Sequence, residues 1–130
     1  MKINKLNYVK QAETVMGCLF NENNGKYVIT SSQMRNIHSL IMGLYDSVRL
    51  NPEEQLDEET KSQIQYVKMR IVYIAGRDKA NNKNSVIEKF LNRSELLNYI
   101  DSIGSSRDDL ILVCRYMEAL VAYHKFDGGR

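Results

Sequence analysis

The sequence has no tryptophan, one proline and only two cysteines among its 130 residues. A single proline permits long helices, because proline removes a backbone donor and breaks helix interiors. Cys18 and Cys114 lie far apart, and the polar start MKINKLNYVKQAE contains no apolar leader segment. We therefore expect two free thiols in a reducing cytoplasm and no disulfide framework.

Long apolar runs are also missing. The longest, at 110–114 and 119–123, fall far short of the roughly 20 residues that a membrane-spanning helix requires. We expect no membrane partner.

The sequence lacks the motifs that hold metals, cofactors or phosphates. The cysteines and histidines form no CxxC, HxxxH or CxxH pair, and the glycines never approach GxxxxGK or GxGxxG. We expect no metal, no cofactor and no catalytic site. A small ribonuclease using His124 with Tyr123 or Lys125 is the enzymatic alternative. We favour a packed, hydrogen-bonded histidine, because a general base needs a positioned partner.

Charge is distributed unevenly along the chain. The formal net charge is +2, from 18 basic and 16 acidic residues. The segment NPEEQLDEE, residues 51–59, holds five carboxylates and no base, so the rest of the chain has 18 basic against 11 acidic residues. A basic face is thus possible, and nucleic acid becomes a candidate partner.

Apolar spacing predicts an all-α fold, a compact bundle of about five helices in a single domain spanning residues 1–130. Thr30 and Gln33 predict a capping box for the second helix, and the third should run from about Asp57 to Lys79. A break near Asn92 is expected in the fourth. The expected apolar stripes are Leu6, Val9, Ala12, Met16 and Leu19; Met34, Ile37, Ile41, Leu44 and Val48; Ile64, Val67, Ile71, Ile74 and Ala75; and Val86, Phe90, Leu97 and Ile100.

The C-terminal helix should be central in the bundle. Its apolar residues, between Leu110 and Tyr123, point in almost every direction around the axis. Ser105 or Ser106 can cap its start, and Gly128 with Gly129 should end it. A short extended piece, Tyr27 to Ile29, should precede the second helix.

Tyr66, Arg70, Tyr73 and Arg77 fall within about a 60° arc of the third helix, away from its apolar stripe. Guanidinium groups interleaved with tyrosine rings suit phosphate oxygens and nucleobases. The alternative is that the tyrosines pack at the edge of the core and the arginines pair with the acidic segment.

Further basic residues could extend this face. They are Arg35 on the second helix, Lys68 on the third, and Arg115 and Lys125 on the last. Arg115, in an otherwise apolar run, must reach the surface or pair with Glu118.

Three segments carry a family resemblance: SSQMRNI (31–37), IQYVKMRIVYIAGR (64–77) and CRYMEALVAYHKFDGG (114–129). Together they resemble the small subunit of the type III-A CRISPR effector, the Csm complex. The resemblance implies a helical, non-catalytic subunit of antiviral defence, stacked head to tail in several copies beside the guide RNA. Its implied partners are guide (CRISPR) RNA, target RNA, the backbone and large subunits, and other copies of itself.

The resemblance implies phosphate contacts for Arg35, Lys68, Arg77 and Arg115, which match basic positions of these motifs. Arg70 and Lys125 complete our predicted RNA-binding set from the residue pattern itself. A helical scaffold that binds only protein, with no RNA contact, is the alternative.

Overall fold

The computed structural model describes residues 2–25, 29–81 and 85–129, which form six α-helices and no strand. The helices are α1 (Tyr8–Glu22), α2 (Ser31–Val48), α3 (Glu58–Asn81), α4 (Val86–Ser94), α5 (Leu96–Ser102) and α6 (Arg107–Phe126). The predicted all-α class is therefore confirmed. Of the extended piece expected at Tyr27 to Ile29, the first two residues lie outside the described residues, and Ile29 is buried.

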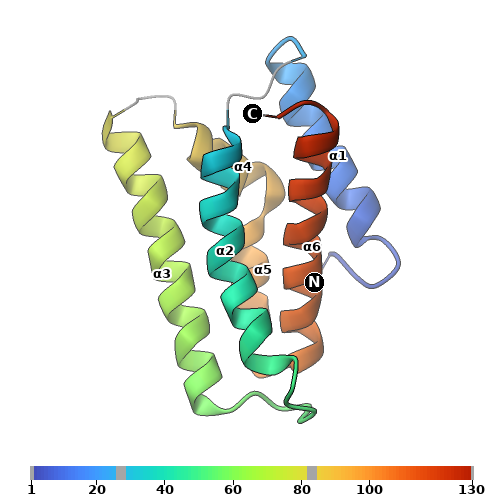
Figure 1. The fold of residues 1–130 in the computed structure, drawn as a ribbon, viewed down its shortest axis with the longest axis vertical. Coiled ribbons are helices and arrows are strands. Elements are labelled where there is room, and N and C mark those ends of the chain that lie inside the picture. Colours follow the sequence, from blue (N-terminus) through green and yellow to red (C-terminus); the bar gives the residue numbers. More distant parts are fainter. Residues whose placement is uncertain (1, 26–28, 82–84, 130) are drawn as a thin grey trace.

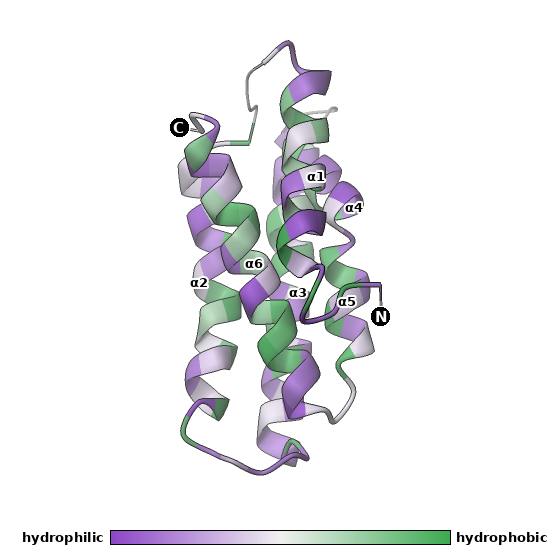
Figure 2. Ribbon diagram, turned by 90° about the vertical axis from the view of Figure 1, so that its right-hand side faces the viewer, coloured by the Kyte–Doolittle hydropathy of each residue, from purple (hydrophilic) through white to green (hydrophobic). Residues whose placement is uncertain are grey.

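The helices pack in two layers. In Figure 1, α3, α2 and α6 lie side by side with α2 in the middle, and α4 and α5 lie behind them. Helix α1 packs against α6 and α4. Figure 2 shows that the loops at both ends of the bundle are mostly hydrophilic, whereas hydrophobic residues concentrate along the helices. This arrangement leaves α3 covered on only one side.

Local signals set the helix boundaries. The Thr30 hydroxyl accepts from the Gln33 amide at 3.1 Å, and the Gln33 side chain accepts from the Thr30 amide at 2.9 Å, which confirms the capping box. Ser106 caps α6 by accepting from the Asp109 amide at 3.2 Å.

The predicted fourth helix is two helices, so the bundle has six helices among its described residues. The break lies at Glu95, whose φ of 56° is left-handed, three residues beyond the expected position near Asn92. A non-glycine residue adopts this conformation only at some cost, and it interrupts helical hydrogen bonding.

The predicted central position of the last helix is confirmed. Tyr116, almost fully buried on α6, donates from its hydroxyl to the Ser94 carbonyl at 2.9 Å and meets the Tyr99 ring edge-on at 5.3 Å. His124 is 2% exposed, and its Nε2 lies 2.8 Å from the Ile29 carbonyl oxygen. The favoured interpretation of His124 as a packed, hydrogen-bonded residue holds.

The expected stripe of the first helix was wrong at its start. Leu6 is 98% exposed and Val9 is 44% exposed, whereas Ile3 is buried. The cause is a polar turn before α1, in which the Asn4 side chain accepts from the Leu6 amide at 2.8 Å and the Asn7 side chain accepts from the Asn4 amide at 2.7 Å. Asparagine side chains favour such turns over a continuing helix.

The two cysteines should differ sharply in reactivity. Cys114 is buried and its thiol contacts the Ile41 carbonyl, whereas Cys18 is exposed. Burial raises the pKa of the Cys114 thiol to about 12, so at pH 8 only roughly one thiol in 10,000 is the reactive thiolate. We expect iodoacetamide to label Cys18 alone in the native protein and both cysteines in urea, as measured by mass spectrometry. Equal labelling of both in the native state would contradict this packing.

Candidate nucleic-acid interface

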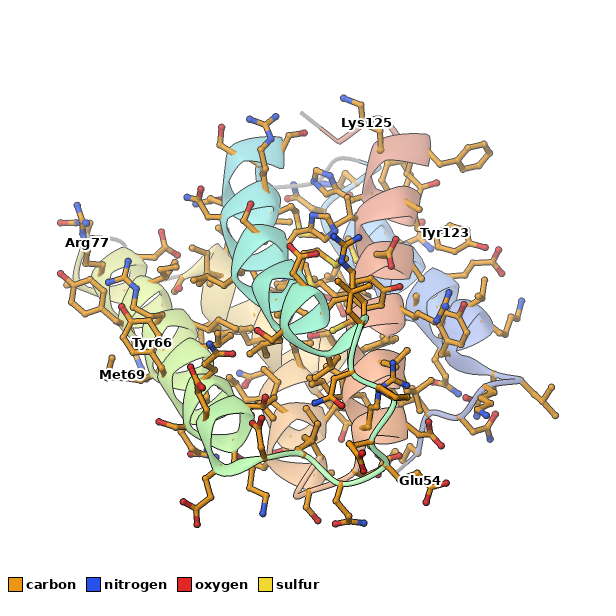
Figure 3. All side chains as sticks on the ribbon, turned by 60° about the horizontal axis from the view of Figure 1, so that its bottom comes forward. Glu54, Tyr66, Met69, Arg77, Tyr123 and Lys125 are labelled. Atoms are coloured by element: carbon orange, nitrogen blue, oxygen red, sulfur yellow. The ribbon has the colours of Figure 1, made fainter. Side chains whose placement is uncertain are left out.

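Helix α3 has two different faces. Thr60, Ile64, Val67 and Ile71 are buried against the bundle. On the other side, Tyr66 is 57% exposed and both Met69 and Tyr73 are 55% exposed. Figure 3 shows Tyr66 and Met69 on the outer side of α3, away from the other helices, and Arg77 near the C-terminal end of α3. The tyrosines therefore do not belong to the edge of the core, contrary to the alternative.

An open groove runs between α2 and α3. Its volume is about 620 Å³, and its lining residues are Asn36, Ser39 and Leu40 from α2, with Arg70, Tyr73, Ile74 and Arg77 from α3. The Arg70 guanidinium lies 5.8 Å from the centre of the Tyr73 ring, a cation–π geometry. The groove thus brings together two predicted RNA-binding arginines and one tyrosine of the predicted stripe.

Asn36, Ser39 and Leu40 were missed by sequence reasoning. They lie on the side of α2 that faces α3, beside its buried stripe. Asn36 and Ser39 are exposed, and Leu40 is half-buried at the edge of the core. No local signal says which helix they face.

Most surface cations outside the predicted set are already engaged. The pairs are Lys2–Glu95, Lys10–Glu13, Arg49–Asp46, Lys79–Glu88, Lys89–Glu22 and Arg93–Glu22. Arg107 donates to the Val48 carbonyl through Nη2 at 3.0 Å. The six ion-paired cations thus share five carboxylates, whereas the carbonyl bonded by Arg107 is neutral.

Lys68 differs from the other predicted residues. Its ammonium pairs with Asp101 of α5 at 2.6 Å, on the side of α3 away from the groove. The structure therefore does not bring Lys68 together with Arg70 and Arg77.

The other five predicted residues carry no ion pair among the described residues. Arg35, Arg77, Arg115 and Lys125 are exposed and Arg70 is half-buried. Arg70 and Arg77 do not pair with the acidic segment, and Arg115 does not pair with Glu118, so both alternatives fail in this structure. The five come from three adjacent helices, α3, α2 and α6 (Figure 1).

The acidic segment is held at the end of the bundle where α2 ends and α6 begins. The Leu56 amide donates to the Ser105 carbonyl at 2.9 Å, and the Arg107 amide donates to the Glu54 carbonyl at 3.1 Å. Asp57 accepts from the Thr60 amide at 2.7 Å, which holds the pKa of its carboxyl below the ordinary value. Figure 3 shows Glu54 well separated from Arg77 and Lys125. The acidic segment therefore lies at one end of the bundle, and Arg77 and Lys125 lie toward the other end.

The described part of the chain contains no cluster of three or more histidine, cysteine or acidic side chains that could hold a metal ion. None of its helices is long and apolar enough to cross a membrane. His124, the residue of the ribonuclease alternative, is buried under the C-terminal turn, where its ring touches Gly129 and offers a substrate almost no surface.

Comparison with known proteins extends over nearly the whole chain. The family model described as Csm2 Type III-A matches residues 4–130. The CRISPR system Cms protein Csm2 of Mycobacterium tuberculosis (strain CDC 1551 / Oshkosh) is 37% identical over 126 residues, which cover 97% of this chain and 95% of the relative. The protein of the same name from Streptococcus thermophilus is 36% identical over 124 residues, which cover 95% of this chain and 93% of the relative.

A more distant relative of that name, from Enterococcus italicus, is 29% identical over 100 residues, covering 75% of this chain and 67% of its own. The family match agrees with the three motifs that suggested the resemblance. The chain belongs to the Csm2 family, the small subunit of the type III-A Csm complex of CRISPR defence.

Proposed function

We propose that this subunit is a non-catalytic RNA-binding component of the Csm complex in the cytoplasm, contacting the backbone of the guide–target duplex. One observation carries the proposal: Arg35, Arg70, Arg77, Arg115 and Lys125 lack ion-pair partners among the described residues, whereas most other cations are paired. An unpaired surface cation is free to replace the counterions of a phosphate. Lys68 stays in the proposed set with a smaller contribution, because it must first leave Asp101.

Backbone contacts suit an RNA-guided complex. Base pairing between guide and target reads the sequence, so the protein needs only contacts that ignore base identity. Arginine forks bind the two nonbridging phosphate oxygens together. A rigid bundle with cations on three adjacent helices can supply such contacts without any reacting group.

We also propose that copies of the subunit stack end to end. The segment between α2 and α3 lies at one end of the bundle, and its Glu53 and Glu54 are exposed, as is Glu58 at the start of α3. The beginning of α2, which carries Arg35, and the ends of α3 and α6, which carry Arg77 and Lys125, lie toward the other end. Exposed apolar residues accompany both ends: Leu50 is 85% exposed beside the acidic segment and Phe126 is 85% exposed beside Lys125. A head-to-tail contact would place opposite charges against each other, and such heterologous contacts propagate into filaments.

The test of RNA contact uses the reconstituted complex with guide RNA. Changing Arg35, Arg70, Arg77, Arg115 and Lys125 jointly to glutamine should weaken target-RNA binding at least tenfold. The slope of log affinity against log salt should become shallower by about 0.9 for each duplex phosphate that the variant no longer neutralises. Binding is measured by fluorescence anisotropy between about 50 and 200 mM salt.

The matched control changes the ion-paired cations Lys2, Lys10, Lys79, Lys89 and Arg93 to glutamine, which removes the same total charge. Every subunit must be present in both assemblies. Unchanged affinity and slope in the first variant, with an intact complex, would reject RNA contact and favour the scaffold that binds only protein.

A further inference from the structure

The groove between α2 and α3 is larger and more varied in its lining than the binding of a single phosphate requires. Its volume of about 620 Å³ lies within the range of ligand sites in proteins. A phosphate contact on a duplex needs only a surface cation, whereas this groove is lined by apolar, aromatic and neutral polar side chains as well as by arginines. The side chains on each surface define what would fit.

The floor is apolar and one wall is aromatic. Leu40 and Ile74 are half-buried and pack against the core. Tyr73 lines the groove with more than half of its side chain exposed. Exposed aromatic rings beside an apolar surface favour a flat, weakly polar group, since stacking on a ring is worth about 1–3 kcal/mol per nucleobase.

The charge of the groove has one sign. Arg70 and Arg77 line it, no carboxylate is among its lining residues, and neither arginine has an acidic partner in the described structure. The two arginines are seven residues apart on one helix, so their Cα atoms are separated by about two turns along the same side. This geometry favours an anionic group beside the flat one.

The opposite wall carries neutral hydrogen-bonding groups. Asn36 and Ser39 reach the groove from α2. An amide offers both donors and an acceptor, and a hydroxyl offers one of each, so together they can bond the edge of a base without requiring one base. Ring, amide and guanidinium groups therefore converge from two helices.

We propose that this groove binds one unpaired nucleotide of an RNA strand, with its base against Tyr73 and its phosphates on Arg70 and Arg77. The inference rests on the proposed RNA contact and deepens it by naming a strand that is locally single. A paired base cannot enter, because its ring faces are stacked and its edge is bonded to its partner. An acidic peptide would use the arginines but leave the ring without a flat partner.

The test is ultraviolet crosslinking in the assembled complex, with guide and target RNA carrying 4-thiouridine. Trypsin cuts after Arg70 and Arg77, so Tyr73 lies in the peptide 71–77, where it is the only aromatic residue. We expect RNA adducts on peptide 71–77, at nucleotides that chemical probing finds unpaired. Tyr73→Phe should keep the adduct, and Tyr73→Leu should reduce its yield about tenfold or more while salt dependence stays the same.

The outcomes separate this inference from the proposed function. Absence of adducts on peptide 71–77 overturns the nucleotide site. If adducts then form on peptides of α2 or α6 outside the groove, the proposed RNA contact is still supported. Absence of adducts on any peptide of this subunit rejects both. Loss of the adduct with excess adenosine 5′-monophosphate, with target binding unchanged, assigns the groove to a free nucleotide and overturns the claim for an RNA strand.

Discussion

Changing Tyr116 to alanine is expected to lower the free energy of unfolding by about 3–5 kcal/mol, the cost of removing a large aromatic side chain from a packed core. Tyr116 is 1% exposed at the centre of α6, touches Tyr99 edge-on and bonds the Ser94 carbonyl where α4 ends. The substitution leaves a cavity and an unbonded buried carbonyl. Urea unfolding followed by circular dichroism measures the change.

Two further variants test the reason for this loss. Tyr66→Ala makes the same chemical change on the exposed face of α3 and should alter stability by no more than about 0.5 kcal/mol. Tyr116→Phe keeps the ring and removes only the hydroxyl, so it should cost about 1–3 kcal/mol for the unsatisfied carbonyl. Equal losses in Tyr116→Ala and Tyr66→Ala would contradict the described core.

Reversing charge at the acidic end is expected to remove neighbouring copies from the Csm complex. In the Glu53→Lys, Glu54→Lys variant, three carboxylates and two lysines remain in segment 51–59, so its charge changes from −5 to −1. The two new lysines would face the cations at the end of the next copy, and like charges in contact cost several kcal/mol. Association between copies should therefore weaken more than a hundredfold. The fold should survive, because the contact from Glu54 to Arg107 uses its backbone carbonyl. Native mass spectrometry of the reconstituted complex counts the copies.

The rescue of this variant is the decisive measurement. Adding Arg35→Glu and Lys125→Glu to the same chain reverses the other end as well, so opposite charges meet again and the copies should return. RNA contacts are weaker in this four-residue variant, so RNA cannot explain the return. As a control, Glu13→Lys with Glu118→Lys makes the same charge change on the sides of α1 and α6. Failure of the rescue in an otherwise folded chain would reject end-to-end charge pairing.

Local features of the chain were predictable from sequence because their causes are local. The Thr30–Gln33 capping box involves residues three apart. The buried stripe of α2, from Met34 to Val48, follows the helical period, and all its members are buried. The helical period also placed Tyr66 and Tyr73 away from the apolar stripe of α3, but it left open whether they pack at the edge of the core; the structure shows that both are more than half exposed.

Errors arose where a distant or competing contact decided the outcome. Leu6 has a hydrophobic side chain in helical register, but the asparagine turn before α1 carries it into solvent. Lys68 belongs by sequence to the same basic helix as Arg70. Its pairing with Asp101, 33 residues away, follows from the packing of α3 beside α5.

By itself the sequence determined the all-α class, most helix boundaries, the central last helix and, through three motifs, the family. These depend on neighbours along the chain, within a turn or two of helix. Only the tertiary structure decided that Asn36 and Ser39 face Arg70 and Tyr73 across a groove, and which cations remain unpaired. The physical reason is that the helical period fixes the direction of a side chain around its own axis, whereas its partner depends on how all six helices pack.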